Sequence, residues 1–471
     1  MVFSSLIFLY AFLPLNLIFY FMFKHQGYRN GVLIVFSLFF YAWGEPIWVT
    51  ILIFSACIDF VHGLIAEKYR GQWQGKVALI SSITVNLSLL VFFKYSGFLV
   101  DNINTLWGTN LVIRQFGLPI GISFYSFQTI SYVIDVYRGE VAAQRSVLKL
   151  LLFVSLFHQL VAGPIVRYKE IAAEIENRSI SWASFGAGVQ RFAVGLGKKV
   201  ILANTAGARA AIFLDGSVSE LSVLGAWFGI SLFALQIYFD FSGYSDMAIG
   251  LGKMFGFTYL ENFNYPYISQ SIGEFWRRWH MSLGRFFRDY VYIPLGGSRR
   301  MGLRNLFLVW FLTGLWHGAS WNFVLWGLYY GAFIALERLF LGKVLNQLHK
   351  AFSHIYVIGI SLAGWVLFYF VDLSQGLAFF RVMLGLTAAP LTDVLLQIHF
   401  ANNLLFLAVA VIACTPLPSR LYRRHILTAR WSGLRSLNEA VFGPVYASVM
   451  YAVSTALLVG GTYNPFLYFR F

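Results

Sequence analysis

The stretch "LRNLFLVWFLTGLWHGASWNFVLWGLYYGAFIALERLFL", residues 303–341, is an apolar run that is too long for one membrane helix. At a rise of about 1.5 Å per residue it would extend beyond roughly 50 Å, whereas the hydrocarbon core of a bilayer is about 30 Å thick. The run must therefore break, and the polar cluster from Thr313 to Asn322 marks the position. Irregular backbone at membrane depth is tolerated inside protein or beside a wet cavity. We therefore expect His317, within this cluster, to face a cavity.

The composition of the whole chain predicts a multi-pass helical membrane protein. Of its 471 residues, 58% are hydrophobic and only 12% are charged. A spanning helix needs about 20 apolar residues, and candidate spans lie near 3–23, 31–44, 46–66, 77–94, 116–134, 147–165, 184–204, 221–251, 303–341, 355–372, 394–414 and 443–462. The runs 31–44 and 46–66 are predicted to form a hairpin broken at Gly44-Glu45-Pro46. We predict an all-α fold of about 10 to 12 passes in a single domain, residues 1–471, without a soluble domain or internal repeat.

The net charge of +15 is primarily a topology signal. Lys and Arg gather in the short segments between apolar runs, and such basic loops face the cytoplasm. Lys24, His25 and Arg29 follow the first run directly, which favours an uncleaved first span with its N-terminus outside. A nucleic-acid partner is disfavoured, because no basic patch belongs to a soluble domain.

The segment 273–291 is too charged to span a membrane, yet it has a helical period. Phe275, Trp276, Trp279, Leu283, Phe286, Phe287 and Tyr290 fall on one side of a helix, with His280 at the edge of that side. This pattern predicts one helix lying in the membrane interface. Its arginines, Arg277, Arg278, Arg285 and Arg288, either rest on anionic lipid or hold the phosphates of a cytoplasmic nucleotide-like ligand.

Ionisable groups at membrane depth are costly and are therefore functional candidates. His317 fits best, and the alternative is a neutral histidine bonded to a backbone carbonyl freed at the break. Asp240, in "YFDFSGYSDMAIG", either orients a catalytic histidine or holds a buried hydrogen-bond network.

Motifs of the common catalytic classes are absent from the sequence. It has no G-x-S-x-G elbow, H-E-x-x-H pair, Walker loop or Cys/His cluster with ligand spacing, so we predict no metal and no bound cofactor. A buried imidazole remains, and it suits proton abstraction from an acceptor hydroxyl or proton donation to a thiol leaving group.

Three segments carry a resemblance to a known family. "DFSGYSDMAIGLGKMFGF", "NFNYPYISQSIGEFWRRWHMSLGRFFRDYVYIPLGG" and "GLWHGASWNFVLWG" resemble the membrane-bound O-acyltransferase (MBOAT) family, in its bacterial alginate O-acetyltransferase (AlgI-like) branch. The branch includes peptidoglycan O-acetyltransferases. The opening "MVFSS" and the ending "NPFLYFRF" are similar too, so the resemblance covers nearly the whole chain.

The resemblance implies an enzyme of the bacterial inner membrane that takes acetyl groups from cytoplasmic acetyl-CoA. It implies delivery outward, usually through a separate periplasmic acetyltransferase, to a polysaccharide such as an alginate-like exopolysaccharide or peptidoglycan. It also implies a ring of tilted helices around a central funnel or tunnel. The invariant histidine of the family corresponds to His317, and the second histidine of the branch corresponds to His280.

Beside this resemblance, His317 would accept the proton of an acceptor hydroxyl that attacks the thioester. Asn322, Ser320 and Trp316 are the candidate donors to the oxyanion. By analogy with related acyl-transfer systems, Tyr468 would carry the acyl group, and the alternative is an aromatic anchor at the membrane interface. The competing class of function is a non-catalytic transporter or polysaccharide export subunit in which His317 relays protons.

Overall fold

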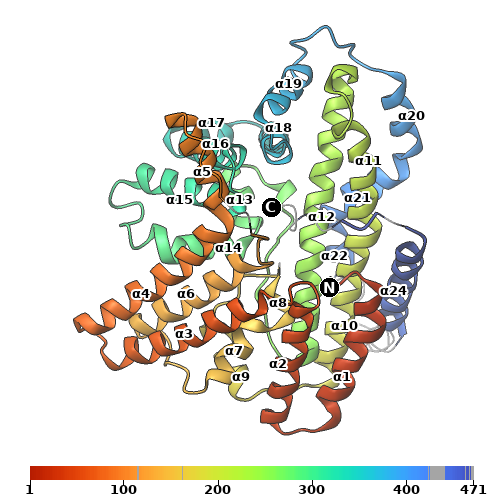
Figure 1. The fold of residues 1–471 in the computed structure, drawn as a ribbon. Helices are drawn as coiled ribbons and strands as arrows, with labels where there is room; N and C mark the ends of the chain where they lie inside the picture. The colour runs from red at the N-terminus through yellow and green to blue at the C-terminus, as the bar shows by residue number, and fades with distance from the viewer. Residues whose placement is uncertain are drawn as a thin grey trace. The chain divides into compact units, whose positions relative to one another are not determined.

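The computed structural model describes residues 1–113, 116–161, 163–422, 424, 441–461, 463–465 and 467. Within these ranges every regular element is helical and no strand occurs, which confirms the all-α prediction (Figure 1). Among the described residues, six helical segments are long and apolar enough to cross a membrane: Val49–Lys68, Trp73–Trp107, Val223–Phe255, Trp321–Gln347, Lys350–Tyr369 and Gly443–Gly460. The pair Val394–Asn402 and Leu404–Ala413, bent by 65°, makes a seventh if it is one span.

The predicted number of passes is larger than this set of long apolar helices. Several predicted spans fold as shorter helices. The run near 3–23 forms Phe8–Met22, and the run near 147–165 forms Val147–Ser155 followed by the short helix Phe157–Leu160. The number of passes and the central funnel stay predictions.

The chain forms two compact units. The first comprises residues 1–192 and 244–260, and the second comprises 193–243 and 261–471. The helices α10 (Trp182–Gly197) and α12 (Val223–Phe255) each contribute to both units. The prediction of a single domain over the whole chain stays a prediction.

The first unit is built from helices alone among its described residues. Its elements are η1 (Phe8–Phe12), α1 (Leu13–Met22), α2 (Gln26–Ala42), α3 (Val49–Lys68), α4 (Trp73–Leu90), η2 (Val91–Tyr95), α5 (Ser96–Trp107), α6 (Ile122–Arg138), α7 (Val147–Ser155), α8 (Phe157–Leu160) and α9 (Tyr168–Glu176). The ends of α2 and α3 confirm the break predicted at Gly44-Glu45-Pro46.

The helices α3, α4 and α6 lie side by side (Figure 1) and enclose a polar cluster. The Asp59 carboxylate, which is fully buried, accepts hydrogen bonds from Ser82 Oγ and Asn86 Nδ2, both at 2.6 Å. His62 Nδ1 lies 3.2 Å from the same carboxylate, and Thr129 Oγ1 donates to Asn86 Oδ1 at 3.1 Å. This satisfied cluster ties the three helices together.

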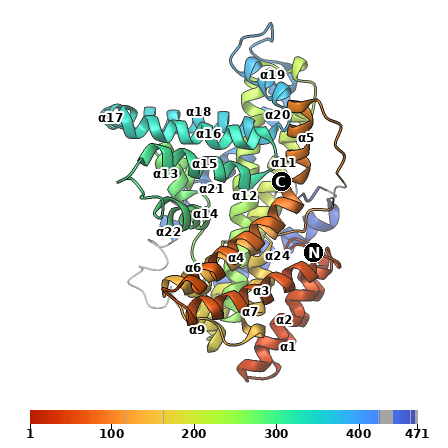
Figure 2. The same ribbon diagram turned by 60° about the vertical axis from the view of Figure 1, so that its left-hand side comes forward.

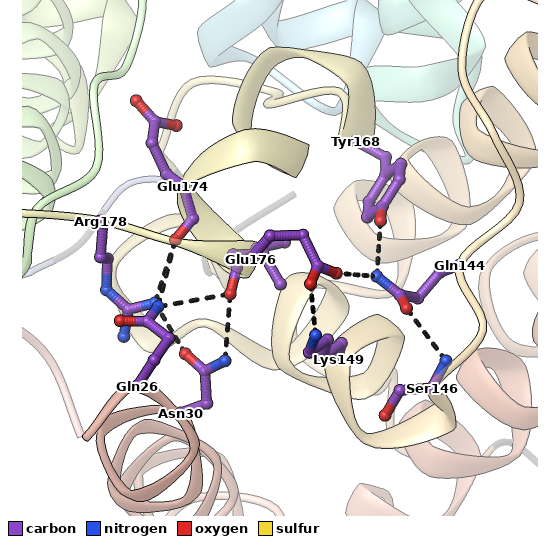
Figure 3. A network of polar contacts seen from close by, with 10 residues as sticks. Gln26, Asn30, Gln144, Ser146, Lys149, Tyr168, Glu174, Glu176 and Arg178 are labelled. Atoms are coloured by element: carbon purple, nitrogen blue, oxygen red, sulfur yellow. Dashed lines mark hydrogen bonds and ion pairs between the residues drawn. The ribbon is translucent and has the colours of Figure 1, made fainter.

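A second polar network, shown in Figure 3, joins α9 and the residues just after it to α2 and to the start of α7. Arg178 Nη1 donates to Asn30 Oδ1 at 2.7 Å, and Gln144 Nε2 donates to Glu176 Oε1 at 2.9 Å. Lys149 forms an ion pair with Glu176. These contacts hold α9 in place although it is too short and polar to be stable alone.

The second unit holds the remaining elements. They are η3 (Lys198–Ala203), α11 (Asn204–Leu214), η4 (Val218–Glu220), η5 (Pro266–Ile268), α13 (Ile272–Arg278), α14 (Met281–Phe287), η6 (Arg288–Tyr292), α15 (Gly302–His317), α16 (Trp321–Leu336), η7 (Glu337–Leu341), α17 (Gly342–Gln347), α18 (Lys350–Tyr369), α19 (Leu373–Met383), α20 (Val394–Asn402), α21 (Leu404–Ala413), α22 (Leu417–Tyr422) and α24 (Gly443–Gly460).

The long run 303–341 breaks where the sequence predicts. Helix α15 ends at His317, Gly318 is extended, and α16 begins at Trp321 and packs against both α15 and α18 (Figure 2). Glycines allow a close approach of α15 and α16. A Cβ on Gly314 would lie 2.3 Å from Phe323 O, and one on Gly327 would lie 2.2 Å from Trp310 O.

The prediction of one helix over 273–291 is wrong. The segment forms α13 and α14, which are separated at Trp279 and His280, and then the π-helical turn η6. The residues just before α13 replace the missing helical bonds, because Met281 N donates to Asn262 O at 3.0 Å and Asn264 N donates to Arg278 O at 2.9 Å. The predicted apolar side is largely buried: Phe275, Trp279, Leu283, Phe286 and Phe287. The position in the membrane interface stays a prediction.

Candidate active site

His317 lies at the C-terminal end of α15, directly before the break. Its side chain is surrounded by aromatic rings: the ring centroids of Trp316 and Trp326 lie 4.9 Å from that of the imidazole, and that of Phe368 lies at 5.4 Å. The residue is only 8% exposed. The surrounding rings exclude water, so polar interactions formed there are stronger than in solvent.

His280 lies at the break between α13 and α14 and is also buried. Its backbone has φ 44° and ψ 53°, a left-handed conformation that a non-glycine residue adopts at an energetic cost. Such strain persists only when the surrounding structure holds it, and it gathers at functional sites.

Asn262 holds His280 in this conformation. Its Oδ1 lies 3.2 Å from His280 Nδ1 and accepts hydrogen bonds from Ser282 N and Ser282 Oγ. Because an amide oxygen is an acceptor only, Nδ1 of a neutral His280 carries the proton and Nε2 presents a lone pair. In the part of the chain that the structure describes, His280 Nε2 has no hydrogen-bond partner. Burial lowers the pKa of His280 to about 3, so the imidazole is neutral at physiological pH.

Trp316 brings the two histidines together. Its ring lies 5.7 Å from that of His280 and 4.9 Å from that of His317. Two imidazoles that are 37 positions apart in the sequence therefore flank one indole ring. Two imidazoles buried close together are suited to general acid–base chemistry.

The remaining predicted oxyanion donors lie at the same break. Ser320 Oγ donates to Asn322 Oδ1, and Asn322 Nδ2 donates to Leu367 O at 3.1 Å. One N–H of the Asn322 amide is therefore used to join the break to α18, next to Phe368. The role of Asn322, Ser320 and Trp316 as oxyanion donors stays a prediction.

Asp240 lies in a buried network, one of its two predicted roles. Its carboxylate pairs with Lys199 Nζ at 2.7 Å and accepts a hydrogen bond from Leu467 N at 3.0 Å. Among the residues that the structure describes, no histidine bonds to this carboxylate. His280 is oriented by Asn262 instead.

The four arginines predicted to meet phosphates differ in their partners. Arg278 pairs with Glu274 at 2.8 Å, and Arg288 pairs with Asp289 at 2.7 Å. Arg285 is partly buried, whereas Arg277 is exposed on α13. Tyr468, the predicted acyl relay, lies outside the described residues.

Sequence reasoning missed Asn262, Lys199 and Phe368. Lys199 gave a usable signal, because a lysine within the apolar run 184–204 needs a partner. Asn262 and Phe368 gave none, because a loop asparagine and a phenylalanine in an apolar helix are ordinary in any membrane protein.

The fold and the site define a multi-pass helical membrane protein with two buried histidines at neighbouring helix breaks. The model of the membrane-bound O-acyltransferase family matches residues 6–371. The chain is 36% identical to a probable alginate O-acetylase AlgI of Azotobacter vinelandii, with the full length of both chains covered. It is 40% identical to that of Pseudomonas aeruginosa, with 83% of this chain and 76% of that protein covered.

A relative of another substrate class is also similar. The peptidoglycan O-acetyltransferase of Helicobacter pylori is 33% identical, with 83% of this chain and 81% of that protein covered. The chain therefore belongs to the membrane-bound O-acyltransferase family and is an O-acyltransferase. This confirms the predicted family and the predicted enzyme class over the non-catalytic alternative.

Proposed function

We propose that this protein takes acetyl groups from cytoplasmic acetyl-CoA and passes them across the bacterial inner membrane toward an extracytoplasmic polysaccharide. A separate periplasmic acetyltransferase would complete the transfer. The relatives named for alginate and peptidoglycan acetylation support a polysaccharide acceptor. The observation that carries the proposal is the pair of buried imidazoles, His317 and His280, beside one tryptophan ring.

The transfer uses His317 as the general base. Its imidazole accepts the proton of an acceptor hydroxyl while the hydroxyl oxygen attacks the thioester carbonyl carbon of acetyl-CoA. When the tetrahedral intermediate collapses, the carbon–sulfur bond breaks. The proton held by His317 then passes to the leaving thiolate, so the products are an acetyl ester and the CoA thiol. A donor at the break, from Asn322, Ser320 or Trp316, stabilises the oxyanion.

His280 is the second imidazole of the site. Its Nδ1–H is committed to Asn262, and its Nε2 lone pair is the one available to accept a hydrogen bond from a reacting group. Asn262 is then a positioning residue, because it sets the tautomer and the ring orientation of His280.

On the donor side, Arg277 is the leading candidate for a CoA phosphate. Arg278 and Arg288 are already in ion pairs with carboxylates, whereas Arg277 is exposed and forms no close ion pair among the described residues. An exposed guanidinium binds phosphate through charge-assisted, bidentate hydrogen bonds. Arg277→Gln should therefore raise the KM for acetyl-CoA and change kcat little.

The direct test measures acetyl transfer from labelled acetyl-CoA by the full-length protein in liposomes. Alginate oligomers and peptidoglycan fragments are compared as acceptors, each with and without a periplasmic acetyltransferase. His317→Ala should reduce transfer by at least about 100-fold, since a general base contributes roughly 10²–10⁴-fold. The matched control is His25→Ala, which removes an exposed imidazole that forms no capping bond to α2. If His317→Ala transfers acetyl groups at the rate of the control, the proposed mechanism is wrong.

A further inference from the structure

Residues 463–465 and 467, called the tail below, contact the core of the second unit. After α24 ends at Gly460, Leu467 lies only 4% exposed within the hydrophobic core of this unit. Two residues before Leu467 in the sequence also make side-chain contacts with this unit. Gln236 Nε2 lies 3.4 Å from Tyr463 OH, and Asn204 Nδ2 donates to Asn464 Oδ1 at 3.1 Å. The tail therefore runs along η3, α11 and α12.

A buried ion pair holds the main chain of this tail. Lys199 and Asp240 are each 3% exposed at the side chain, and their charged atoms lie 2.7 Å apart. Lys199 Nζ also donates to Pro465 O, and Asp240 Oδ2 accepts from Leu467 N at 3.0 Å. The lysine thus binds the carbonyl of Pro465, and the aspartate binds the amide of Leu467, two residues further on.

The local backbone brings these two charges together. Lys199 lies on the π-helical turn η3, a kind of distortion that is common at functional sites. Gly243, three residues after Asp240, allows a close approach of α12, because a Cβ there would lie 2.8 Å from Gly195 O. The motif "DFSG" therefore supplies both the acid and the contact that places it beside Lys199.

The pair and the tail satisfy each other. A buried ion pair is weak evidence for stability, since removing two charges from water offsets most of their attraction. Non-helical backbone at membrane depth needs hydrogen-bond partners from the protein. Lys199 and Asp240 supply partners to the main chain of Pro465 and Leu467, and the tail in turn gives each charged group one hydrogen bond.

The held tail reaches a pocket next to the candidate site. Leu467 lines a pocket of about 990 Å³ together with Phe233, Tyr369 and Phe370. Tyr369 and Phe370 directly follow Phe368, whose ring lies 5.4 Å from that of His317. The same short segment therefore contacts His317 with one residue and lines the pocket with the next two.

Charge places this pocket on the acceptor side of the membrane. The segments that line it, 214–219 and 369–378, contain no Lys or Arg and carry Asp215 and Asp372. The segment 285–304, which precedes and begins α15, carries five arginines: Arg285, Arg288, Arg299, Arg300 and Arg304. By the positive-inside rule the basic segment is cytoplasmic and the pocket faces outward.

We propose that Lys199 and Asp240 are positioning residues that hold the C-terminal tail as a wall of an acceptor-side pocket beside His317. This inference rests on the proposed function, because the tail so held shapes the place where the acyl acceptor approaches. Loss of the ion pair releases the tail and impairs transfer to the acceptor, while acetyl-CoA binding is retained.

The test measures tail release separately from activity. Leu467→Cys is introduced into the full-length protein with Cys57→Ser and Cys414→Ser, and its rate of labelling by a maleimide is measured in detergent. Asp240→Asn should accelerate labelling at least about tenfold, because it removes a buried hydrogen-bonded charge. The matched control is Asp246→Asn, which removes another acid of α12 by breaking the 2.6 Å ion pair between Asp246 and Arg191 of α10, and it should leave the rate unchanged.

A second variant keeps the test decisive if Asp240→Asn folds poorly. Lys199→Met with Asp240→Leu removes both charges and keeps the site apolar, so the unit should fold while the tail is still released. Asp240→Asn and the double variant should both lose acetyl transfer to the acceptor with an unchanged KM for acetyl-CoA. Labelling at the parent rate in the folded double variant would overturn the inference. If the parent itself transfers no acetyl group, the proposed function fails, and labelling alone still decides whether the ion pair holds the tail.

Discussion

The close contact of α15 and α16 allows a prediction whose size follows from the structure. A Cβ on Gly327 would lie 2.2 Å from Trp310 O and 3.1 Å from Gly314 Cα. Ordinary van der Waals contact begins near 3.4 Å, so Gly327→Ala must move the two helices apart by about 1 Å. Gly314 is three residues before His317 on α15. A displacement of α15 at Gly314 therefore also moves the candidate base.

The expected result is a large loss of activity with a modest loss of stability. A displacement of about 1 Å at a catalytic group costs on the order of 100-fold in rate. Overpacking of this kind destabilises a protein by roughly 1–3 kcal/mol. The assay is acetyl transfer from labelled acetyl-CoA, measured beside thermal unfolding of the same sample.

The matched control is Gly359→Ala on α18, where an added Cβ meets no atom within 4 Å. This variant should keep full activity and gain up to about 1 kcal/mol, since alanine is the better helix former. Transfer by a folded Gly327→Ala protein at the rate of the Gly359→Ala protein would refute the reasoning that the contact of the two helices places His317.

Three further predictions concern single side chains. His280→Gly should keep the fold, because glycine adopts the left-handed conformation without strain, yet lower acetyl transfer. It should also flatten the pH dependence of stability. The pKa of His280 is about 3 in the folded state against an ordinary value of 6.5, so between these two pH values the unfolded state binds more protons than the folded state. The stability of the wild type therefore falls as the pH falls from 6.5 to 3, and the variant should lose this contribution. Tyr468→Phe should abolish any acetyl adduct detected by mass spectrometry if that tyrosine is the relay, and an adduct on another residue would end the idea. Asp59→Leu should destabilise the first unit by roughly 2–3 kcal/mol, because Ser82 and Asn86 lose their acceptor; unchanged thermal unfolding would contradict this.

The break at His317 could be predicted by comparing the length of the apolar run with the thickness of the bilayer. The apolar run 303–341 exceeds the thickness of the bilayer, and its polar residues gather at one place. The break at His280 could not. The period of 273–291 is compatible with one continuous helix, and only the bonds from Asn262 and Asn264 interrupt it.

For Asp240, the sequence left open whether the carboxylate orients a histidine or holds a buried hydrogen-bond network. Its position in an apolar run marks it as a residue that needs a partner, and the sequence offers histidines and lysines alike. Packing of α12 against η3 at Gly243 selects Lys199. The same packing brings Leu467 N to Asp240 across 227 positions of sequence.

The sequence by itself determined the class of the protein, its all-helical fold and the place of the break at His317, because apolar length and local periodicity are properties of neighbouring residues. Only the tertiary structure decided which groups surround each charge. Asn262 and His280, Phe368 and His317, and the tail beside Lys199 and Asp240 meet through contacts between distant segments. Such contacts leave no period in the chain, since they depend on how closely whole helices approach each other.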